Sequence, residues 1–274
     1  MRKLRILCLH GYHGSSDVLR GQMQALMEGL ESRVELVFLD APSLSAGDHG
    51  WWHAVPAGSA RGDDNAGVGH APMRYEGWER TRKAIVAAFE ERGPFDGVFG
   101  FSQGAVLTGL LVGLRAPGGV PTPEQPLTFD FAILVSGFVS NDPAHAPLYA
   151  RRASYALPSL HIVGRSDGVV PSRDSRELAA RFGEPTLLEH GGGHVIASDA
   201  STRAGVGTFL EAMSRRRAAP RVPGAGAPRL SRGRLFDERG ERRRGGGVGR
   251  VTGDARDRGR LPYAGHGRLL PGDL

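Results

Sequence analysis

The 274-residue sequence predicts an α/β fold with a mostly parallel central sheet and helices on both of its faces. Two observations carry this prediction. Short apolar segments rich in Leu, Val, Ile and Phe recur along residues 1–215, and segments with apolar residues at helical spacing lie between most of them. A hydrophobic content of 40% is enough for a sizeable core.

The first elements follow this alternation. "LRILCLH" at 4–10 is a continuous apolar run, which is typical of a strand buried on both faces. "VLRGQMQALMEGLES" at 18–32 has the spacing of an amphipathic helix, and "VELVFLD" at 34–40 predicts a second strand. Residues 43–74 break the rhythm, and we interpret this Gly- and Asp-rich segment as a long loop or lid.

The middle of the chain returns to the pattern. "YEGWERTRKAIVAAFEER" at 75–92 carries apolar residues at helical spacing and predicts a helix. "FDGVFGF" at 95–101 predicts a strand, and "QGAVLTGLLVGLR" at 103–115 predicts a helix that begins directly after it. "FDFAILVSGF" at 129–138 predicts the next strand.

Four further elements complete the expected fold. "SLHIVG" at 159–164 and "PTLLEH" at 185–190 predict strands. "SRDSRELAARF" at 172–182 and "ASTRAGVGTFLEAMSRR" at 200–216 predict helices. No internal repeat interrupts the series, so residues 1–215 are expected to form one domain.

Residues 216–274 differ in composition. Residues 218–274 hold 13 Arg against 6 Asp and Glu, whereas residues 1–217 hold 22 Lys and Arg against 23 Asp and Glu, so the net charge of +6 belongs to this tail. With 13 Gly and 5 Pro in its 57 residues, the tail is predicted to be disordered. Arg/Gly-rich segments can bind nucleic acid. Here Phe236 and Tyr263 are the only aromatic stacking partners, and nucleic-acid binding by the tail is not expected.

The remaining composition favours an intracellular protein without a cofactor. Cys8 is the only cysteine, which excludes an intramolecular disulfide framework and a cysteine-based zinc site, and its apolar surroundings predict a buried thiol. No apolar run approaches the about 18 residues of a membrane span, and the start lacks a signal-peptide cleavage site. We therefore expect cytoplasmic localisation, and the His and Asp spacing predicts no metal site.

The segment "GFSQGA" at 100–105 carries the first chemical signal, the spacing Gly-x-Ser-x-Gly around Ser102. A strand is predicted to end at this segment and a helix to begin after it, so the turn would lift the serine hydroxyl above the end of the sheet. Gly100 and Gly104 would allow the two backbones to approach closely. This context predicts a nucleophilic serine, with the backbone N–H of Gln103 directed at an oxyanion.

A serine nucleophile needs a base that is oriented by an acid, and both follow later predicted strands. Asp167 lies in "HIVGRSDGVVP" and His194 in "LLEHGGGHVIA", each just after a strand. The order Ser102, Asp167, His194 is the chain order of α/β-hydrolases, which makes these three the predicted triad. Asp40 is a weaker candidate for the acid.

Neighbouring residues have supporting interpretations. In α/β-hydrolases the second oxyanion donor comes from a loop after an early strand, and "LHGYHGSS" at 9–16 predicts the backbone N–H of Tyr12 for this role. His10 is expected to hold that loop, and Ser15 or Ser16 to cap the helix that follows. His161 and His190 are interpreted as structural.

With these residues identified, residues 3–212 resemble the serine hydrolase FSH family, of the fungal and ovarian-cancer-associated type, within the α/β-hydrolase superfamily. The resemblance rests on quoted motifs: "LRILCLHGY", "LVFLDAP", the "WW" pair, "FDGVFGFSQGA", "LHIVGRSDGVVPS" and "LEHGGGHVIA". It implies the triad Ser102, Asp167 and His194, and oxyanion donors at the amides of Tyr12 and Gln103. The Gly- and Asp-rich segment after the "WW" pair and the tail depart from the family pattern.

The resemblance implies a serine esterase or thioesterase that acts on small acyl esters through an acyl-enzyme. Trp51 and Trp52 are expected to line an acyl pocket or to pack their loop onto the body, and both can hold. Two alternatives stay open: an acyl-protein thioesterase or carboxylesterase, which shares "GFSQG", and a hydrolase-fold binding protein without activity. The oligomeric state is not predicted.

Overall fold

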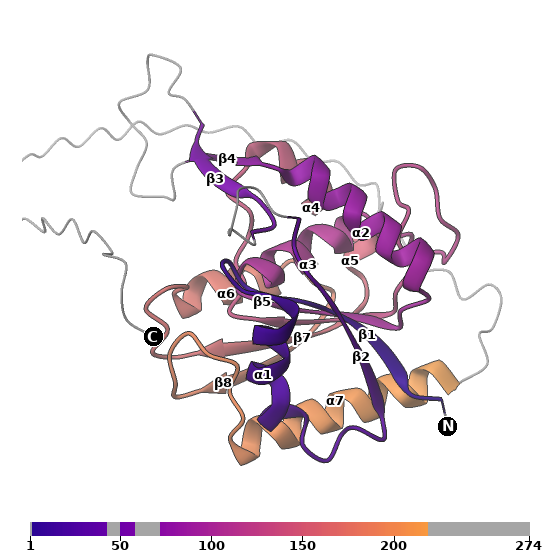
Figure 1. The fold of residues 1–274 in the computed structure, drawn as a ribbon, viewed down its shortest axis with the longest axis vertical. Coiled ribbons are helices and arrows are strands. Elements are labelled where there is room, and N and C mark those ends of the chain that lie inside the picture. Colours follow the sequence, from indigo (N-terminus) through magenta and orange to yellow (C-terminus); the bar gives the residue numbers. More distant parts are fainter. Residues whose placement is uncertain (1, 43–49, 58–71, 219–274) are drawn as a thin grey trace, which may run out of the picture. The chain divides into compact units, whose positions relative to one another are not determined.

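A computed structural model describes residues 2–42, 50–57 and 72–218. Its centre is a six-stranded sheet in the order β2-β1-β5-β6-β7-β8, in which every neighbouring pair is parallel (Figure 1). The strands of this sheet are β1 (Leu4–Leu9), β2 (Val34–Leu39), β5 (Gly97–Phe101), β6 (Phe131–Val135), β7 (Pro158–Gly164) and β8 (Glu184–His190). This is the mostly parallel sheet that the alternation of elements predicted.

Helices cover both faces of the sheet, as Figure 1 shows. The helices are α1 (Ser16–Met27), α2 (Trp78–Arg92), α3 (Gln103–Gly113), α4 (Ala146–Tyr149), α5 (Arg152–Tyr155), α6 (Ser172–Ala179) and α7 (Ala200–Ala218), with a 3-10 turn at Pro143–His145. Apolar residues of α1 and α7 pack on one face, and apolar residues of α2, α3 and α6 pack on the other. The sheet therefore has a hydrophobic core on each side.

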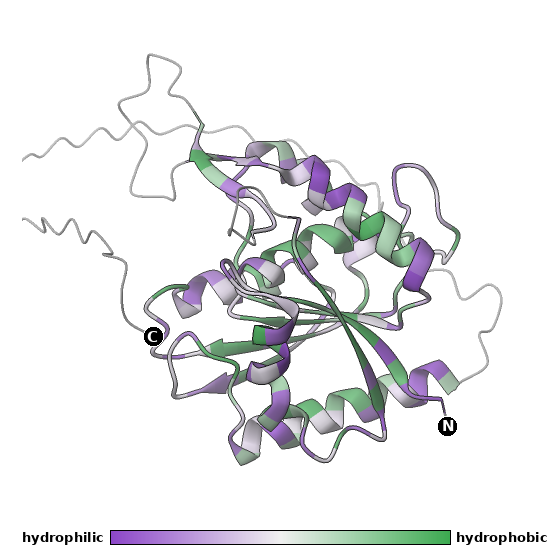
Figure 2. Ribbon diagram, viewed as in Figure 1, coloured by the Kyte–Doolittle hydropathy of each residue, from purple (hydrophilic) through white to green (hydrophobic). Residues whose placement is uncertain are grey.

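The strand sequences explain why the sheet is buried on both faces. All five residues of β5 and all five of β6 are buried, which is the pattern of central parallel strands. Figure 2 shows the same contrast, with apolar colour along the central strands and mixed polar and apolar colour along α1, α2 and α7. The edge strand β8 instead exposes most of its residues.

The strand order reverses between β1 and β5. From β1 the chain moves outward to β2, then crosses over β1 to β5 and continues through β6, β7 and β8. In an open parallel sheet, a crevice forms beyond the carboxyl ends of the two strands where the order reverses, and ligands bind there. The loop after β1 and the turn after β5 both begin at this point.

The segment at 43–74, interpreted as a loop, also contains β-structure. Strand β3 (His53–Pro56) pairs antiparallel with β4 (Met73–Glu76). Trp52 precedes β3, and its ring stacks on that of Tyr75 in β4, with centroids 4.6 Å apart and planes at 8°. This stacking supports a hairpin where the sequence indicated none. Residues 43–49 and 58–71 lie outside the described residues, so the interpretation of this segment as a lid stays a prediction.

Other predicted elements agree with the structure to within a few residues, with two differences. Helix α2 begins at Trp78 rather than at residue 75, because residues 75 and 76 belong to β4. The short helices between residues 143 and 155 were not predicted. The predicted boundary at 215 and the disorder of 216–274 stay predictions, because residues 219–274 lie outside the described part.

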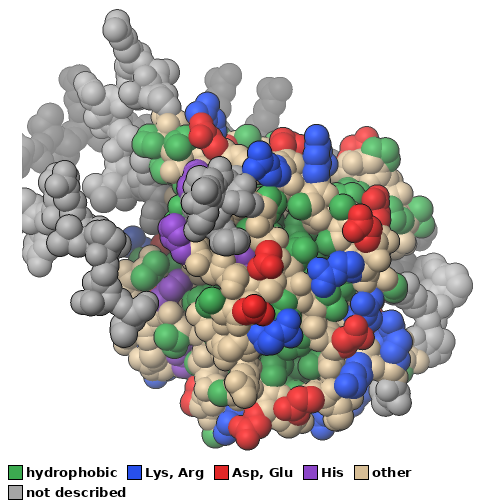
Figure 3. Space-filling view, viewed as in Figure 1, with side chains coloured by type: hydrophobic (Ala, Val, Ile, Leu, Met, Phe, Trp, Pro, Cys, Tyr) green, Lys and Arg blue, Asp and Glu red, His purple; other side chains and the backbone are tan. Residues whose placement is uncertain are grey.

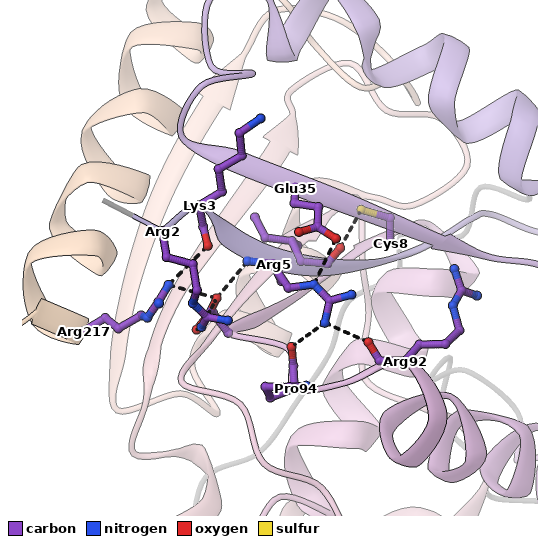
Figure 4. Close-up of polar contacts among 10 residues, drawn as sticks. Arg2, Lys3, Arg5, Cys8, Glu35, Arg92, Pro94 and Arg217 are labelled. Carbon is purple, nitrogen blue, oxygen red and sulfur yellow. Dashed lines mark hydrogen bonds and ion pairs between the residues drawn. The ribbon is translucent and has the colours of Figure 1, made fainter.

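At the amino ends of β1 and β5, the buried carboxylate of Asp96 joins distant segments through Arg2, Arg5 and Arg217, which are labelled in Figure 4. Asp96 is 8% exposed and accepts hydrogen bonds from the backbone N–H of Arg5 at 2.8 Å, from Arg2 at 2.9 Å and from Arg217 at 3.3 Å. Arg217 also donates to the carbonyl of Lys3 at 3.2 Å. The start of the chain and the end of α7 are thereby fixed beside β5, at the opposite end of the strands from Ser102.

Two smaller predictions concern buried and apolar segments. Cys8 is fully buried in β1, and burial raises the pKa of its thiol well above the usual range. This agrees with a structural thiol. Within the described ranges, none of the helices has both the length and the apolar character needed to cross a membrane.

Candidate active site

Ser102 lies in a sharp turn between β5 and α3, as the Gly-x-Ser-x-Gly spacing predicted. Its backbone has φ 53° and ψ −118°, a conformation that a non-glycine residue adopts only under strain. The two glycines of the motif make the turn possible because neighbouring backbone atoms leave no room for a side chain at either position. A Cβ on Gly100 would lie 2.1 Å from the carbonyl oxygen of Gly104, and a Cβ on Gly104 would lie 2.2 Å from that of Leu9.

The structure brings the three residues of the predicted triad together. His194 Nε2 lies 2.9 Å from Ser102 Oγ, and His194 Nδ1 lies 2.8 Å from Asp167 Oδ2. Ser102 comes from the turn after β5, Asp167 from the loop after β7 and His194 from the loop after β8. These distances are those of hydrogen bonds, so a continuous chain of contacts joins the carboxylate to the hydroxyl.

The carboxylate of Asp167 is held in its charged form. Its side chain is 1% exposed, and this burial raises its pKa. The backbone N–H groups of Val169 and Val170 donate to Oδ1 at 2.9 and 2.8 Å, and His194 donates to Oδ2. These hydrogen bonds outweigh burial, so the pKa of Asp167 lies below its usual value of 3.8.

An ionised Asp167 determines which nitrogen of His194 carries the proton. The carboxylate only accepts hydrogen bonds, so Nδ1 must be the donor. Nε2 is then left with its lone pair toward the Ser102 hydroxyl. The imidazole is 19% exposed and lies against the ring of Phe101, with centroids 5.0 Å apart. Figure 3 shows histidine side chains gathered on the side of the molecule toward which β7 and β8 run.

The loop after β1 lies beside Ser102. A Cβ on Gly11 would come within 3.3 Å of Ser102 Cβ. His10 is buried, and its Nε2 accepts a hydrogen bond from the backbone N–H of Ala41 at 3.0 Å. Its Nδ1 therefore carries the proton and donates to the carbonyl oxygen of Gly11 at 2.7 Å. His10 holds the loop, as expected.

This contact also orients the backbone N–H of Tyr12. In a trans peptide the carbonyl and the next N–H point in opposite directions. Because the Gly11 carbonyl is directed at the His10 ring and at the N–H of Gly14, 3.1 Å away, the Tyr12 N–H is directed away from that ring. The phenol of Tyr12 extends outward and lies 3.2 Å from Nδ1 of His53 in β3.

The second predicted oxyanion donor is at the start of α3. Gln103 is the first residue of this helix, where backbone N–H groups have no carbonyl partner within the helix and the helix dipole is positive. The side chain of Gln103 adds something that the sequence did not indicate. It accepts from the N–H of Trp51 at 3.0 Å and donates to the carbonyl of Trp52 at 2.9 Å.

Trp51 and Trp52 are both buried, at 0% and 2% exposure, in the core cluster beside α2 and α3. This burial confirms one of the two interpretations given above, in which the pair packs its loop onto the body. A role in lining an acyl pocket stays a prediction.

The other candidates are held elsewhere. Asp40 accepts from the N–H of Ser16 at 2.6 Å, at the start of α1, which Ser15 caps by accepting from the N–H of Val18 at 3.2 Å. His161 is buried with its Nε2 3.0 Å from Ser159, and burial lowers its pKa to about 3. His190 accepts from the N–H of Gly192 at 3.1 Å and supports the loop of His194. No group of three His, Cys, Asp or Glu side chains suited to a metal ion occurs in the parts of the chain that the structure describes.

Comparison with known proteins gives this geometry a family. Esterase OVCA2 of Xenopus tropicalis is 33% identical over 226 residues, which cover 77% of this chain and 93% of that protein. Among solved structures, esterase PE8 has a TM-score of 0.53 at 23% identity, covering 77% of this chain and 93% of that one. Zea mays acyl-protein thioesterase 2 has a TM-score of 0.51 at 19% identity, covering 78% and 94%.

The two structural similarities show a shared α/β-hydrolase fold. The family profile described as serine hydrolase (FSH1) matches residues 1–206, which include all of the site residues discussed above. With this match and the relative at 33% identity, the chain belongs to the FSH1 family of serine hydrolases.

Proposed function

We propose that this protein is a serine esterase or thioesterase that cleaves small acyl esters through an acyl-enzyme. One observation carries the proposal: the uninterrupted contacts from Asp167 through His194 to Ser102, at 2.8 and 2.9 Å. Family membership and the naming of relatives as esterases support ester hydrolysis in general. The roles of individual residues are inferred from their positions.

In the first half of the proposed reaction, His194 Nε2 takes the proton of Ser102 and the serine oxygen attacks the ester carbonyl. The carbonyl oxygen gains a negative charge, which the backbone N–H groups of Tyr12 and Gln103 stabilise. Asp167 stabilises the imidazolium that forms. His194 then gives its proton to the leaving alcohol or thiol, and the acyl group stays on Ser102.

In the second half, water replaces the alcohol. His194 accepts a proton from the water molecule, and the resulting hydroxide attacks the acyl carbonyl in the same oxyanion site. The C–O bond to Ser102 breaks, His194 returns the proton to the serine oxygen, and the free acid leaves. The strained turn at Ser102 supports both halves because it holds the serine oxygen 2.9 Å from His194 Nε2.

Labelling with a fluorophosphonate probe tests the proposal. Wild-type protein is compared with Ser102→Ala and His194→Ala, and Ser201→Ala serves as a control because this serine lies at the start of α7. We expect labelling of the wild type and of Ser201→Ala alone. Equal labelling of Ser102→Ala, or none of the wild type, would overturn the triad and favour a binding protein without activity.

The substrate class follows from rates measured on matched compounds. Esters and thioesters with acetyl, butyryl and octanoyl chains are compared with an S-acylated peptide. Higher kcat/KM for the small compounds is expected under this proposal. A clear preference for the S-acylated peptide would instead support the acyl-protein thioesterase alternative.

A further inference from the structure

Trp51 occupies a position between three parts of the molecule that otherwise belong to different elements. Its side chain has no exposed surface. The centroid of its indole ring lies 5.0 Å from the centroid of the His10 ring, on the loop after β1. The backbone of Trp51 runs beside Gln103, at the start of α3, and beside Thr81 in α2.

Each polar group of Trp51 binds a different one of these parts. Its backbone N–H donates to Oε1 of Gln103 at 3.0 Å, and its carbonyl accepts a hydrogen bond from the hydroxyl of Thr81. Its indole Nε1 donates to the carbonyl oxygen of His10 at 2.8 Å. Buried hydrogen bonds in a low-dielectric environment hold their partners firmly, because breaking one leaves an unsatisfied polar group.

Two of these three partners carry or adjoin the proposed oxyanion donors. Gln103 supplies one of the N–H groups directly. His10 precedes Gly11, and the side chain of His10 orients the peptide that carries the N–H of Tyr12. Trp51 is therefore hydrogen-bonded to both halves of the proposed oxyanion site, although its own side chain is buried.

We propose that Trp51 is a positioning residue that sets the separation of the two oxyanion donors. This inference rests on the proposed function, since it concerns the same site. The two N–H groups follow different strands, and an oxyanion hole needs both within about 2.7–3.1 Å of one oxygen atom. The hydrogen bonds of Trp51 hold the turn after β5 and the loop after β1 in one arrangement, independently of the acyl chain of the substrate.

This role predicts a specific kinetic effect. Complete loss of one oxyanion donor costs roughly 10²–10³ in kcat. Removing the indole N–H would loosen one donor rather than remove it, so we expect kcat to fall about tenfold. Because every ester forms the same oxyanion, the loss should be the same for short and long acyl chains, and KM should change less than twofold.

The experiment uses Trp51→Phe, which keeps an aromatic ring but lacks the donor, in the full-length protein. Trp78→Phe is the matched control, since Trp78 is a half-buried tryptophan in α2 that packs against Trp52 and His145. A second test variant, Gln103→Met, removes the side-chain contacts with Trp51 and Trp52 but keeps the backbone N–H of residue 103. It preserves the test if Trp51→Phe fails to fold, which urea unfolding will show.

Two readouts separate positioning from a merely structural role. The first is kcat and KM for acetyl, butyryl and octanoyl esters. The second is the inhibition constant of a trifluoromethyl ketone, which Ser102 attacks to form a hemiketal oxyanion while His194 takes the serine proton. A positioning role predicts that inhibitor affinity and kcat fall by the same factor, because both depend on the oxyanion donors.

The double variant Trp51→Phe/Gln103→Met supplies a further check. If both residues act through the same arrangement, the kcat of the double variant should equal that of the single variant with the lower kcat. Independent roles would instead multiply the two fold-losses. Multiplied effects would contradict a shared role.

Three further outcomes would overturn the inference. The first is an unchanged kcat in Trp51→Phe. The second is a loss that grows with acyl length through KM, which would indicate contact with the acyl chain. The third is a wild type without esterase activity, with Ser102→Ala behaving identically, and this result would also overturn the proposed function.

Discussion

Replacing Gly104 by alanine tests how closely α3 must pack against the loop after β1. A Cβ at this position would lie 2.2 Å from the carbonyl oxygen of Leu9 and 2.6 Å from that of His10. Real Cβ contacts do not fall below 3.0 Å, so the gap must open by about 0.8 Å. Both neighbouring atoms are backbone atoms at the end of a central strand, which cannot turn aside as a flexible side chain would.

The expected cost has two parts. Overpacking of a rigid contact costs up to roughly 3 kcal/mol, and the better helix propensity of alanine returns about 1 kcal/mol, so stability should fall by about 2 kcal/mol. The same movement separates the N–H of Gln103 from that of Tyr12. A misplacement of about 1 Å at a reacting centre can cost roughly 100-fold in rate, which is our expectation for kcat.

Urea unfolding and hydrolysis of p-nitrophenyl acetate measure the two effects. Gly21→Ala is the matched control, because Gly21 also lies within a helix, and a Cβ there would meet nothing within 4 Å. It should gain about 0.8–1 kcal/mol and keep the wild-type kcat. If Gly104→Ala retains both wild-type stability and wild-type kcat, the argument from close packing is wrong.

Three further outcomes are expected. Asp167→Asn should lower kcat by about 10⁴, because an amide can donate to Nδ1 of His194 and stabilise the wrong tautomer; steady-state kinetics would show this, and a loss below tenfold would contradict it. Burial holds the pKa of His161 at about 3, so below pH 6.5 the unfolded chain binds a proton that the folded chain does not. The free energy of unfolding therefore decreases as the pH is lowered from 7 to 5. Between pH 7 and pH 5, the free energy of unfolding measured in urea should decrease by about 2 kcal/mol less in His161→Gln than in the wild type. Equal decreases would refute the low pKa of His161. Asp96→Ala should cost roughly 2–3 kcal/mol in stability by removing the acceptor of Arg2, Arg5 and Arg217, with kcat unchanged, and a comparable fall in kcat would show that the two ends of the strands are coupled.

The sequence predicted most of the sheet and the residues that meet at its edge. Each central strand is a continuous apolar run, and burial on both faces leaves that pattern in the sequence. Ser102 and Asp167 follow such runs, and His194 follows the shorter apolar segment of the edge strand β8, so parallel strands place all three at one edge of the sheet. The side-chain distances themselves depend on loop conformations, such as the left-handed φ of Ser102, that only the structure gives.

The hairpin β3–β4 was not predictable in the same way. Its strands have four residues each, and 16 residues separate Pro56 from Met73, so neither turn chemistry nor length indicated a pair. Tyr75 and Glu76 were predicted as helix because they adjoin the apolar spacing of α2. In the structure they pair with Ala54 and His53.

Contacts made through the backbone also left no sequence pattern. The side chain of Gln103 binds backbone atoms of residues 51 and 52, and backbone atoms are the same in every residue type. The presence of two tryptophans at positions 51 and 52 therefore did not indicate this contact. The "WW" pair indicated a role near the site, but its hydrogen bonds to His10 and Gln103 could be identified only from the structure.

The placement of His194 after the edge strand β8 has a consequence for synthesis of the protein. His194, the proposed base, follows Ser102 by 92 residues, and β8, which precedes it, is the last strand of the sheet in the sequence. At translation rates of about 5–20 residues per second, the ribosome delivers the serine roughly 5–18 s before the imidazole. Under the proposed function, a nascent chain would carry an unactivated hydroxyl until nearly all of the sheet has emerged, and we expect a fragment that ends before residue 194 not to hydrolyse esters.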